Sequence, residues 1–338
     1  MTATLPRTAV QVPTVFISDD AVTHLTDWPS AIAALRQAYE SPVTPDMVPP
    51  RMMARGQGFW LRSLCAVSPS GETMGSKLIA ASPRAHRASY LISLFDQRTM
   101  DLVALIDGNQ ITGIRTAATA ALAVDLLAPR KPLRVAVIGS GFEAQGQLAA
   151  LLSIRPVERV RVYSPTPASR ARFVDRFLAQ VNDVQAAESA RQAVEGADVV
   201  LCAARSRDES PVLSGAWLEA GMTVVSIGST LPEQREIDAD AMARAAIIVA
   251  DMPDEVAHDT GDAIAARRAH IDIDSKLISL ADLASGRATG RRSPQDIALY
   301  KSVGSALQDV VIAEALWRKA RDEGHCTVLP QTILTIDK

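Results

Sequence analysis

The chain has 338 residues, of which 48% are hydrophobic and 22% charged, and its formal net charge is −3 at pH 7. This composition is typical of a globular protein with room for two domains, and it gives no reason to expect nucleic acid or a membrane surface as a partner. No apolar run is long enough to span a bilayer, the first residues do not resemble a signal peptide, and the scattered cysteines and histidines favour a reducing cytoplasm and no metal site.

The first part of the chain, up to about residue 128, predicts a mixed or antiparallel sheet with helices beside it. A helix is expected over residues 28–39, because Pro29 suits a first turn and Ser41-Pro42 ends the pattern. Strand-like runs separated by turn signals follow at residues 58–67, 73–80, 89–96 and 102–106.

An alanine-rich helix is expected after these strands, with Thr112 as its N-cap and Pro129 just beyond its end. The helix is apolar on all sides, which predicts that it is buried between domains or between subunits. Arg115 would then lie in its first turn, where a cation opposes the helix dipole, so we expect an anion opposite this side chain.

Two more cations stand in unexpected places. Lys77 lies inside the strand-like run 73–80, and Arg51 follows two prolines. Taken alone, Lys77 is interpreted as a solvated or snorkelling side chain. Arg115 taken alone could form a structural ion pair with a protein carboxylate. Together, Arg51, Lys77 and Arg115 predict a pocket for a small acid, because arginine holds a carboxylate through two parallel hydrogen bonds.

A glycine-rich turn follows the apolar strand predicted at residues 133–138. Its residues, Gly139-Ser140-Gly141-Phe142-Glu143-Ala144, form the G-x-G-x-x-A version of a dinucleotide-binding turn. Gly139 allows the sharp turn, Gly141 lets a pyrophosphate approach the backbone, and Ala144 keeps the next helix close to the sheet. The N–H groups of that helix would face the phosphates, so all six residues are candidate cofactor ligands. An ordinary glycine turn is disfavoured by the strand before it and the helix after it.

Strands and helices alternate from residue 133 to about 250, which predicts a parallel, doubly wound sheet. Ligands bind at the carboxyl ends of such strands, where the further cofactor candidates are Ser164, Thr166, Ala203 and Gly228. No carboxylate follows the second strand, and Arg170 lies nearby, a pattern that favours NADP(H) and leaves NAD(H) possible. Arg170 and Arg172 could instead lie on the solvated face of a helix.

The residues resemble the ornithine cyclodeaminase/μ-crystallin family from about residue 50 to 317. Besides the glycine turn, the resemblance rests on Gly75-Ser76-Lys77-Leu78, Asp107-Gly108-Asn109-Gln110-Ile111-Thr112, Arg115-Thr116-Ala117-Ala118, Gly196-Ala197-Asp198-Val199-Val200, Arg235-Glu236-Ile237-Asp238, Gly261-Asp262 and Lys301-Ser302-Val303-Gly304. It implies an α/β fold in which a Rossmann-type dinucleotide-binding domain, residues 129–304, is inserted into a mixed α+β substrate-binding and dimerisation domain, residues 1–128 plus 305–338. It also implies a homodimer, Ser302 as a cofactor residue, and Arg51, Lys77 and Arg115 as carboxylate-binding cations.

Two departures from the family pattern bear on activity. Thr230 stands where cyclodeaminases and the family's alanine dehydrogenases have an Asp, and a hydroxyl cannot accept a proton near neutral pH. This change disfavours ornithine cyclodeamination and leaves open the reduction of a preformed imine. Ser164-Pro165-Thr166 replaces Asn-Arg-Thr of μ-crystallin-like members, which weakens the preference for NADP(H).

The sequence therefore predicts a cytoplasmic, ketimine reductase-like oxidoreductase that uses NAD(P)H to reduce a small, preferably cyclic α-imino acid such as pyrroline-2-carboxylate or piperideine-2-carboxylate. Arg51 and Arg115 would hold the carboxylate and Thr230 would orient the nitrogen; Lys77 would bond the carboxylate or a proton-supplying water. Lys77, Arg115 and Thr230 are the candidate catalytic residues. The alternatives are an ornithine cyclodeaminase, an alanine- or opine-type dehydrogenase, and a non-catalytic protein that binds NADPH and a small ligand.

Overall fold

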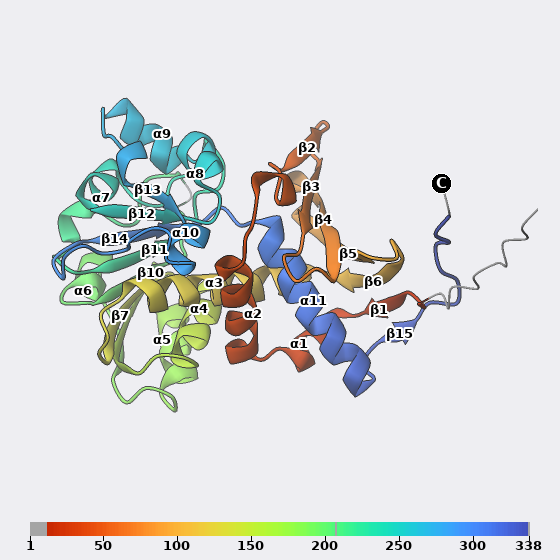
Figure 1. Cartoon of the computed structure of the whole chain (residues 1–338). Helices are drawn as coiled ribbons and strands as arrows, with labels where there is room; N and C mark the ends of the chain where they lie inside the picture. Colours follow the sequence, from red (N-terminus) through yellow and green to blue (C-terminus); the bar gives the residue numbers. More distant parts are fainter. Residues whose placement is uncertain (1–11, 207, 337–338) are drawn as a thin grey trace, which may run out of the picture.

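A computed structural model describes residues 12–206 and 208–336 and contains two β-sheets with helices between and around them (Figure 1). One sheet is mixed and the other is wholly parallel. The expected α/β fold class is therefore confirmed. Strands of the mixed sheet come from residues 15–107 and 327–328, and those of the parallel sheet from residues 133–301. The predicted domain bounds remain a prediction.

The mixed sheet is antiparallel except where β1 runs beside β6. Its strands, in spatial order, are β15 (Thr327–Val328), β1 (Val15–Ile17), β6 (Leu102–Asp107), β5 (Arg87–Asp96), β4 (Thr73–Ser82), β3 (Trp60–Val67) and β2 (Met52–Arg55). The four runs predicted in this region are β3 to β6, and the short strands β1, β2 and β15 were not predicted.

The parallel sheet has the strand order of a doubly wound fold. Its strands, in spatial order, are β13 (Leu277–Ser279), β12 (Ile247–Ala250), β14 (Ala298–Lys301), β11 (Thr223–Ser226), β10 (Val199–Cys202), β7 (Leu133–Ile138), β8 (Val157–Tyr163) and β9 (Val184–Ala186). Later strands continue on one side of β7 for β8 and β9 and on the other side for β10 and β11. This reversal marks the crevice in which such sheets bind ligands, and it lies at the glycine turn after β7.

The helices of the parallel-sheet region connect and cover its strands. They are α4 (Phe142–Leu152), α5 (Pro167–Phe177), α6 (Ala190–Val194), α7 (Ala239–Arg244), α8 (Pro253–Asp259), α9 (Gly261–Arg268) and α10 (Leu280–Ala284). None of the helices in the described residues is long and apolar enough to cross a bilayer.

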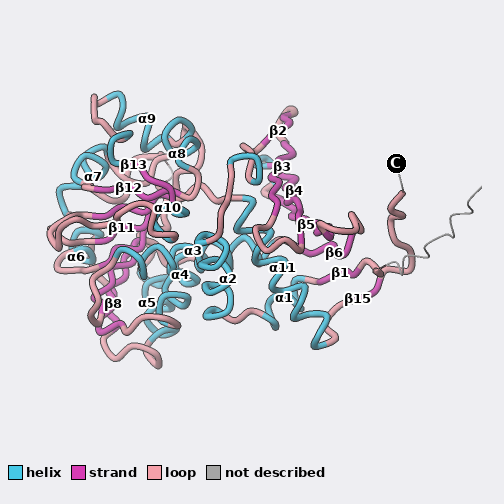
Figure 2. The backbone as a smooth tube through the Cα atoms, viewed as in Figure 1, coloured by secondary structure: helices cyan, strands magenta, loops and turns pink. Residues whose placement is uncertain are grey.

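Helix α3 (Asn109–Leu127) is buried along most of its length and packs on α4, on α2 (Trp28–Glu40) and on α11 (Ala306–Glu323). Figure 2 shows α2, α3 and α11 between the two sheets, with α1 (Asp19–Leu25) beside them. The predicted burial of α3 is confirmed, because α4 belongs to the parallel-sheet region and α11 covers the mixed sheet.

The predicted start of α3 is wrong. The helix begins at Asn109 with Gly108 as its N-cap, and the Thr112 hydroxyl donates to the Gly108 carbonyl at 3.0 Å from within the helix. Arg115 therefore lies in the second turn, beyond the region in which the dipole acts most strongly on a charge. Its position has to be explained by its contacts.

Helix α11 carries polar groups to the mixed sheet. Ser305 and Gln308 form a capping box at its start, and the helix packs across β3, β4 and β5. Asp309 is fully buried on the sheet-facing side, and Glu314 accepts hydrogen bonds there, among them one of 2.5 Å from Thr73. Because β14 leads directly into α11, the connecting residues 302–304 lie where the two sheets approach each other.

Candidate active site

The glycine turn after β7 has the space that a bound phosphate needs. Gly139 has φ +107°, and a Cβ there would lie 2.5 Å from the Ala203 carbonyl oxygen, so only glycine fits. Gly141 is the N-cap of α4, and a Cβ added to it would meet nothing within 4 Å. No side chain caps the start of α4, which leaves its first N–H groups free for an anion.

The loop after β8 is held from inside. The Ser140 hydroxyl donates to the Ser164 hydroxyl at 2.8 Å, and Arg170 donates to the Ser164 carbonyl at 2.9 Å. The guanidinium of Arg170 is buried and lies over the Tyr163 ring, 5.6 Å from its centroid. Thr166 is the N-cap of α5 and makes no side-chain capping bond. Arg170 therefore stabilises this loop through its contacts with the Ser164 carbonyl and the Tyr163 ring.

Lys77 and Arg115 meet at one carboxylate. Lys77 Nζ lies 2.7 Å from Asp309 Oδ1, and Arg115 Nε lies 3.2 Å from the same oxygen. Arg115 also donates to Gln308 Oε1 at 3.1 Å. Burial lowers the pKa of Lys77 to about 8, and the charge of Arg115 adds to the lowering while Asp309 opposes it. The anion expected opposite Arg115 is thus provided by α11.

Arg51 joins this group from the loop before β2. Its Nη2 lies 2.5 Å from Glu255 Oε2 and donates to the Gly304 carbonyl at 2.6 Å, and its Nη1 donates to the Val303 carbonyl at 3.1 Å. A Cβ at Gly304 would lie 2.5 Å from Arg115 Nη1, so Gly304 contacts both guanidinium groups and leaves no room for a side chain. The three cations singled out in the sequence therefore lie together, although each is paired with protein groups.

A cavity of about 310 Å³ lies between these cations and the glycine turn. Its lining residues include Thr112, Arg115, Glu143, Ala203, Gly228, Thr230 and Ser302. Glu143 Oε2 is buried without a hydrogen-bond partner among the described residues. Burial raises the pKa of Glu143, although the charges of Arg115 and Lys77 oppose the rise. The cavity thus joins the candidate cofactor residues to one cation of the predicted clamp.

Asp251, at the end of β12, fixes the turn between β14 and α11. Its carboxylate accepts from the Ser302 hydroxyl at 2.6 Å and from the backbone N–H groups of Val303 and Gly304 at 3.0 and 2.9 Å. Gln308 Nε2 donates to it as well, at 3.0 Å. Asp251 therefore positions the carbonyl groups that bind Arg51.

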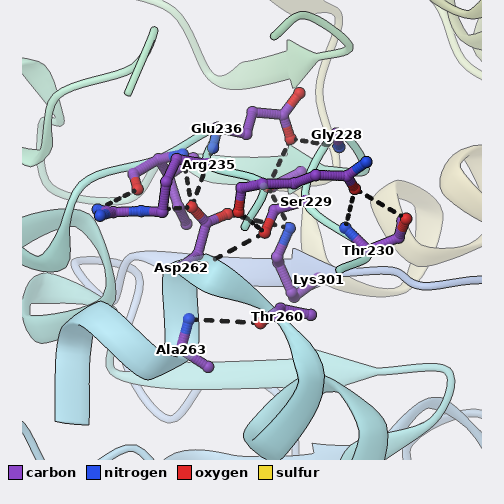
Figure 3. Close-up of polar contacts among 12 residues, drawn as sticks. Gly228, Ser229, Thr230, Arg235, Glu236, Thr260, Asp262, Ala263 and Lys301 are labelled. Carbon is purple, nitrogen blue, oxygen red and sulfur yellow. Dashed lines mark hydrogen bonds and ion pairs between the residues drawn. The ribbon is translucent and has the colours of Figure 1, made fainter. Parts of the chain in front are cut away.

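A second buried polar network lies under the loop after β11 (Figure 3). Glu236 accepts from the Gly228 N–H at 2.8 Å and from the Ser226 hydroxyl at 2.6 Å. Lys301 donates to Ser226 at 3.0 Å and lies 3.2 Å from Asp262 Oδ2. The charged side chains of Glu236, Asp262 and Lys301 are all fully buried. These contacts hold the carboxyl end of β11 in a fixed shape.

Thr230 lies on this loop with its hydroxyl turned to Gln234. The Thr230 N–H and hydroxyl both donate to Gln234 Oε1, each at 3.0 Å. Since the hydroxyl proton is used here, the oxygen is left as an acceptor toward the cavity that Thr230 lines.

Sequence reasoning missed the carboxylates that organise the site. Asp251, Glu255 and Asp309 were not singled out, since a single acidic residue in a helix or strand end is ordinary. Glu236 and Asp262 stood inside motifs that carried the resemblance, but no role was assigned to them. One signal could have indicated these carboxylates. Several cations lie in segments whose pattern predicts burial, and each buried cation needs an anion in the folded chain.

The fold and the site together define a Rossmann-type protein with a cationic pocket beside its glycine turn. The chain belongs to the ornithine cyclodeaminase/mu-crystallin family, whose model matches residues 29–324.

Named relatives agree with this assignment. A Delta(1)-pyrroline-2-carboxylate reductase of Bacillus cereus is 27% identical over 268 residues, which are 77% of this chain and 81% of the relative. The ketimine reductase mu-crystallin of Mus musculus is 28% identical over 299 residues, 86% of this chain and 90% of the relative. The structure of Thermococcus litoralis Delta(1)-pyrroline-2-carboxylate reductase in complex with NADH and L-proline matches with a TM-score of 0.85 at 24% identity, covering 94% of this chain and 100% of that one.

Proposed function

We propose that this protein is an oxidoreductase that uses NAD(P)H to reduce a small α-imino acid to the amino acid. The observation that carries the proposal is the gathering of Arg51, Lys77 and Arg115 beside a cavity that also reaches the glycine turn. The reductase and mu-crystallin relatives support the same class of reaction.

The residues present fit a nicotinamide dinucleotide. The open space at Gly141 and the uncapped start of α4 suit a pyrophosphate, and Ala203 and Gly228 lie at the carboxyl ends of neighbouring strands. When bound, the cofactor supplies a hydride to the imine carbon. NADP(H) is the preferred form in our proposal because no carboxylate follows β8, and NAD(H) remains the alternative.

The side chains of the pocket act on the substrate by position and charge. Arg115 and Arg51 hold the substrate carboxylate, and Lys77 keeps a proton next to that clamp through its shared contact with Asp309. The Thr230 oxygen accepts the N–H of the bound iminium, which orients the C=N bond and leaves its carbon electrophilic. As the carbon gains the hydride, the C=N electron pair moves to nitrogen, and no protein base is required for this step.

The exposed face of the mixed sheet supports a homodimer. The face opposite α11 presents apolar side chains such as Phe16, Leu61 and Leu91, which are 37%, 47% and 38% exposed. A second copy would cover this patch. Light scattering of the purified chain tests the proposal, and a monomeric mass at micromolar concentration would contradict it. A cytoplasmic location belongs to the same proposal.

The test of function is a substrate panel. Oxidation of NADPH and NADH is followed with pyrroline-2-carboxylate, piperideine-2-carboxylate and linear imines formed from 2-oxo acids with ammonium. Reduction of at least one imino acid is expected. Conversion of ornithine to proline with ammonia release would favour a cyclodeaminase, and tight NADPH binding without turnover on any imine would favour a binding protein.

A further inference from the structure

Arg62 lies on β3, within reach of the charges of Arg51 and Glu255. It is half-buried, its Nε is fully shielded and has no hydrogen-bond partner, and no ion pair joins it to any described residue. Its close neighbour is the Trp60 ring, whose centroid lies 5.1 Å from the guanidinium carbon. Burying a guanidinium without an ion-pair partner destabilises the folded protein unless a ligand supplies the negative charge.

The strand register places Arg62 on the same face as the predicted clamp. Arg62 pairs with Ile79 on β4, and Lys77 lies two residues from Ile79, so the two cations project from one face of the sheet. On the other side Arg62 pairs with Met53 of β2, two residues after Arg51. Arg62 is therefore a diagonal neighbour of the clamp cations.

Tyr90 and Gly108 connect this face of the sheet to the start of α3. Tyr90 pairs with Ile79 from β5, and a Cβ at Gly108, the N-cap of α3, would lie 3.2 Å from Tyr90 Cβ. The first turns of α3 then carry Thr112 and Arg115 into the cavity lining. Arg62 does not line the cavity itself; the strand register places it on the adjoining sheet face, next to Lys77 and close to Arg51.

Three of the four cations in this region pair directly with a carboxylate. Glu255 pairs with Arg51, and Asp309 is shared by Lys77 and Arg115, so no carboxylate is left for Arg62. Burial lowers the pKa of Arg62 and the positive charge of Arg51 lowers it further, while the negative charge of Glu255 opposes this lowering. Of these four cations, Arg62 is therefore the one with no carboxylate at ion-pair distance among the described residues.

We infer that Arg62 binds a second acidic group on the substrate, so that the preferred substrate is an α-imino dicarboxylate of about the length of succinate or glutarate. The inference rests on the proposed function and names the substrate class within it. The α-carboxylate binds Arg51 and Arg115, the distal carboxylate binds Arg62 through its forked N–H groups, and the imine carbon between them receives the hydride.

The test compares acidic and neutral imines of matched chemistry. Oxaloacetate and 2-oxoglutarate with ammonium supply the dicarboxylic imines, and pyruvate and 2-oxobutyrate with ammonium supply the monocarboxylic ones. We expect kcat/KM to be higher for a dicarboxylic imine. In Arg62→Leu this value should fall about 100-fold, the loss of a charge-assisted pair, while monocarboxylic imines are reduced as before. Arg62→Lys should restore part of the activity.

The control is Arg55→Leu, which removes a nearby exposed cation from the end of β2 and should leave the preference unchanged. If Arg62→Leu reduces all imines as the wild type does, or if monocarboxylic imines are preferred, the dicarboxylate inference falls and the imine reductase proposal stands. If neither class nor the cyclic imines are reduced, both fall. NADPH binding by Arg62→Leu, measured by fluorescence, shows that the variant is folded.

Discussion

Lys77 Nζ lies 2.7 Å from Asp309 Oδ1, and both side chains are only 1% exposed. The pair joins β4 of the mixed sheet to α11. This helix follows β14 of the parallel sheet in the chain and packs on the mixed sheet. A contact that spans 232 positions of sequence thus fixes the ammonium group beside Arg115.

The first prediction concerns this carboxylate. Asp309→Asn keeps the shape of the side chain but leaves Lys77 and Arg115 without a counter-charge in a buried place. The free energy of unfolding should fall by about 3–5 kcal/mol, as measured by urea denaturation. Asp274→Asn breaks an exposed pair with Arg267 and should cost at most about 1 kcal/mol. Equal losses in the two variants would contradict the buried role of Asp309.

The second prediction concerns pH. The pKa of Lys77 is about 8, below its ordinary value of 10.5, so the charged ammonium is lost as the pH rises through about 8. If that charge supports substrate binding, kcat/KM should fall above pH 8. In Lys77→Arg the group stays charged, and the alkaline fall should move to higher pH. Titration of the substrate iminium is common to both proteins, so identical profiles would rule out Lys77 as the group responsible.

The same pKa shift affects stability with a defined sign. A lysine whose folded pKa is depressed gives up its proton more readily in the folded state. The buried ammonium therefore lowers the free energy of unfolding by its full amount below about pH 8. This destabilisation is lost as the pH rises from about 8 toward 10.5. The relief should be absent from Lys77→Arg, and denaturant titrations at pH 8 and pH 10 measure the difference.

The third prediction separates substrate binding from cofactor binding. Arg115→Ala removes the guanidinium that lines the cavity, and KM for the imino acid should rise by about 100-fold. The dissociation constant for NADPH should stay within about twofold, because the side-chain hydrogen bonds of Arg115 go to Asp309 and Gln308 of α11 and none goes to a described residue of the glycine turn. Unchanged reduction kinetics in Arg115→Ala would show that the clamp is assigned to the wrong residue.

The fourth prediction compares two glycines of one turn. Gly141→Val should fold normally, since nothing lies within 4 Å of its new Cβ, but it should weaken dinucleotide binding at least about 10-fold by filling the phosphate space. Gly139→Ala should instead lower the melting temperature, because φ is +107° and the new Cβ would meet Ala203. Normal NADPH affinity in Gly141→Val would contradict the position of the pyrophosphate.

The sequence predicted those features that depend on local pattern. The strand and glycine turn of β7 follow from a short apolar run and its glycines, and Arg51, Lys77 and Arg115 drew attention because each was unusual for its segment. Asp309 could not be found in this way, because it occupies an unremarkable position in an amphipathic helix. Its importance comes from tertiary packing alone.

Two errors have equally physical causes. Thr112 has the residue type of an N-cap, but the helix starts three residues earlier and uses the Thr112 hydroxyl to bond the Gly108 carbonyl. Strand β14 was not predicted. It is only four residues long and ends in the charged Lys301, so its hydropathy does not indicate a fully buried strand. Its insertion between β11 and β12 depends on pairing that no local signal encodes.

The link from β14 to α11 has a mechanical consequence. Residues 302–304 connect the two sheets covalently, and the Val303 and Gly304 carbonyl groups accept hydrogen bonds from Arg51. Movement of the parallel-sheet region against the mixed-sheet region should therefore carry the Arg51 guanidinium with it.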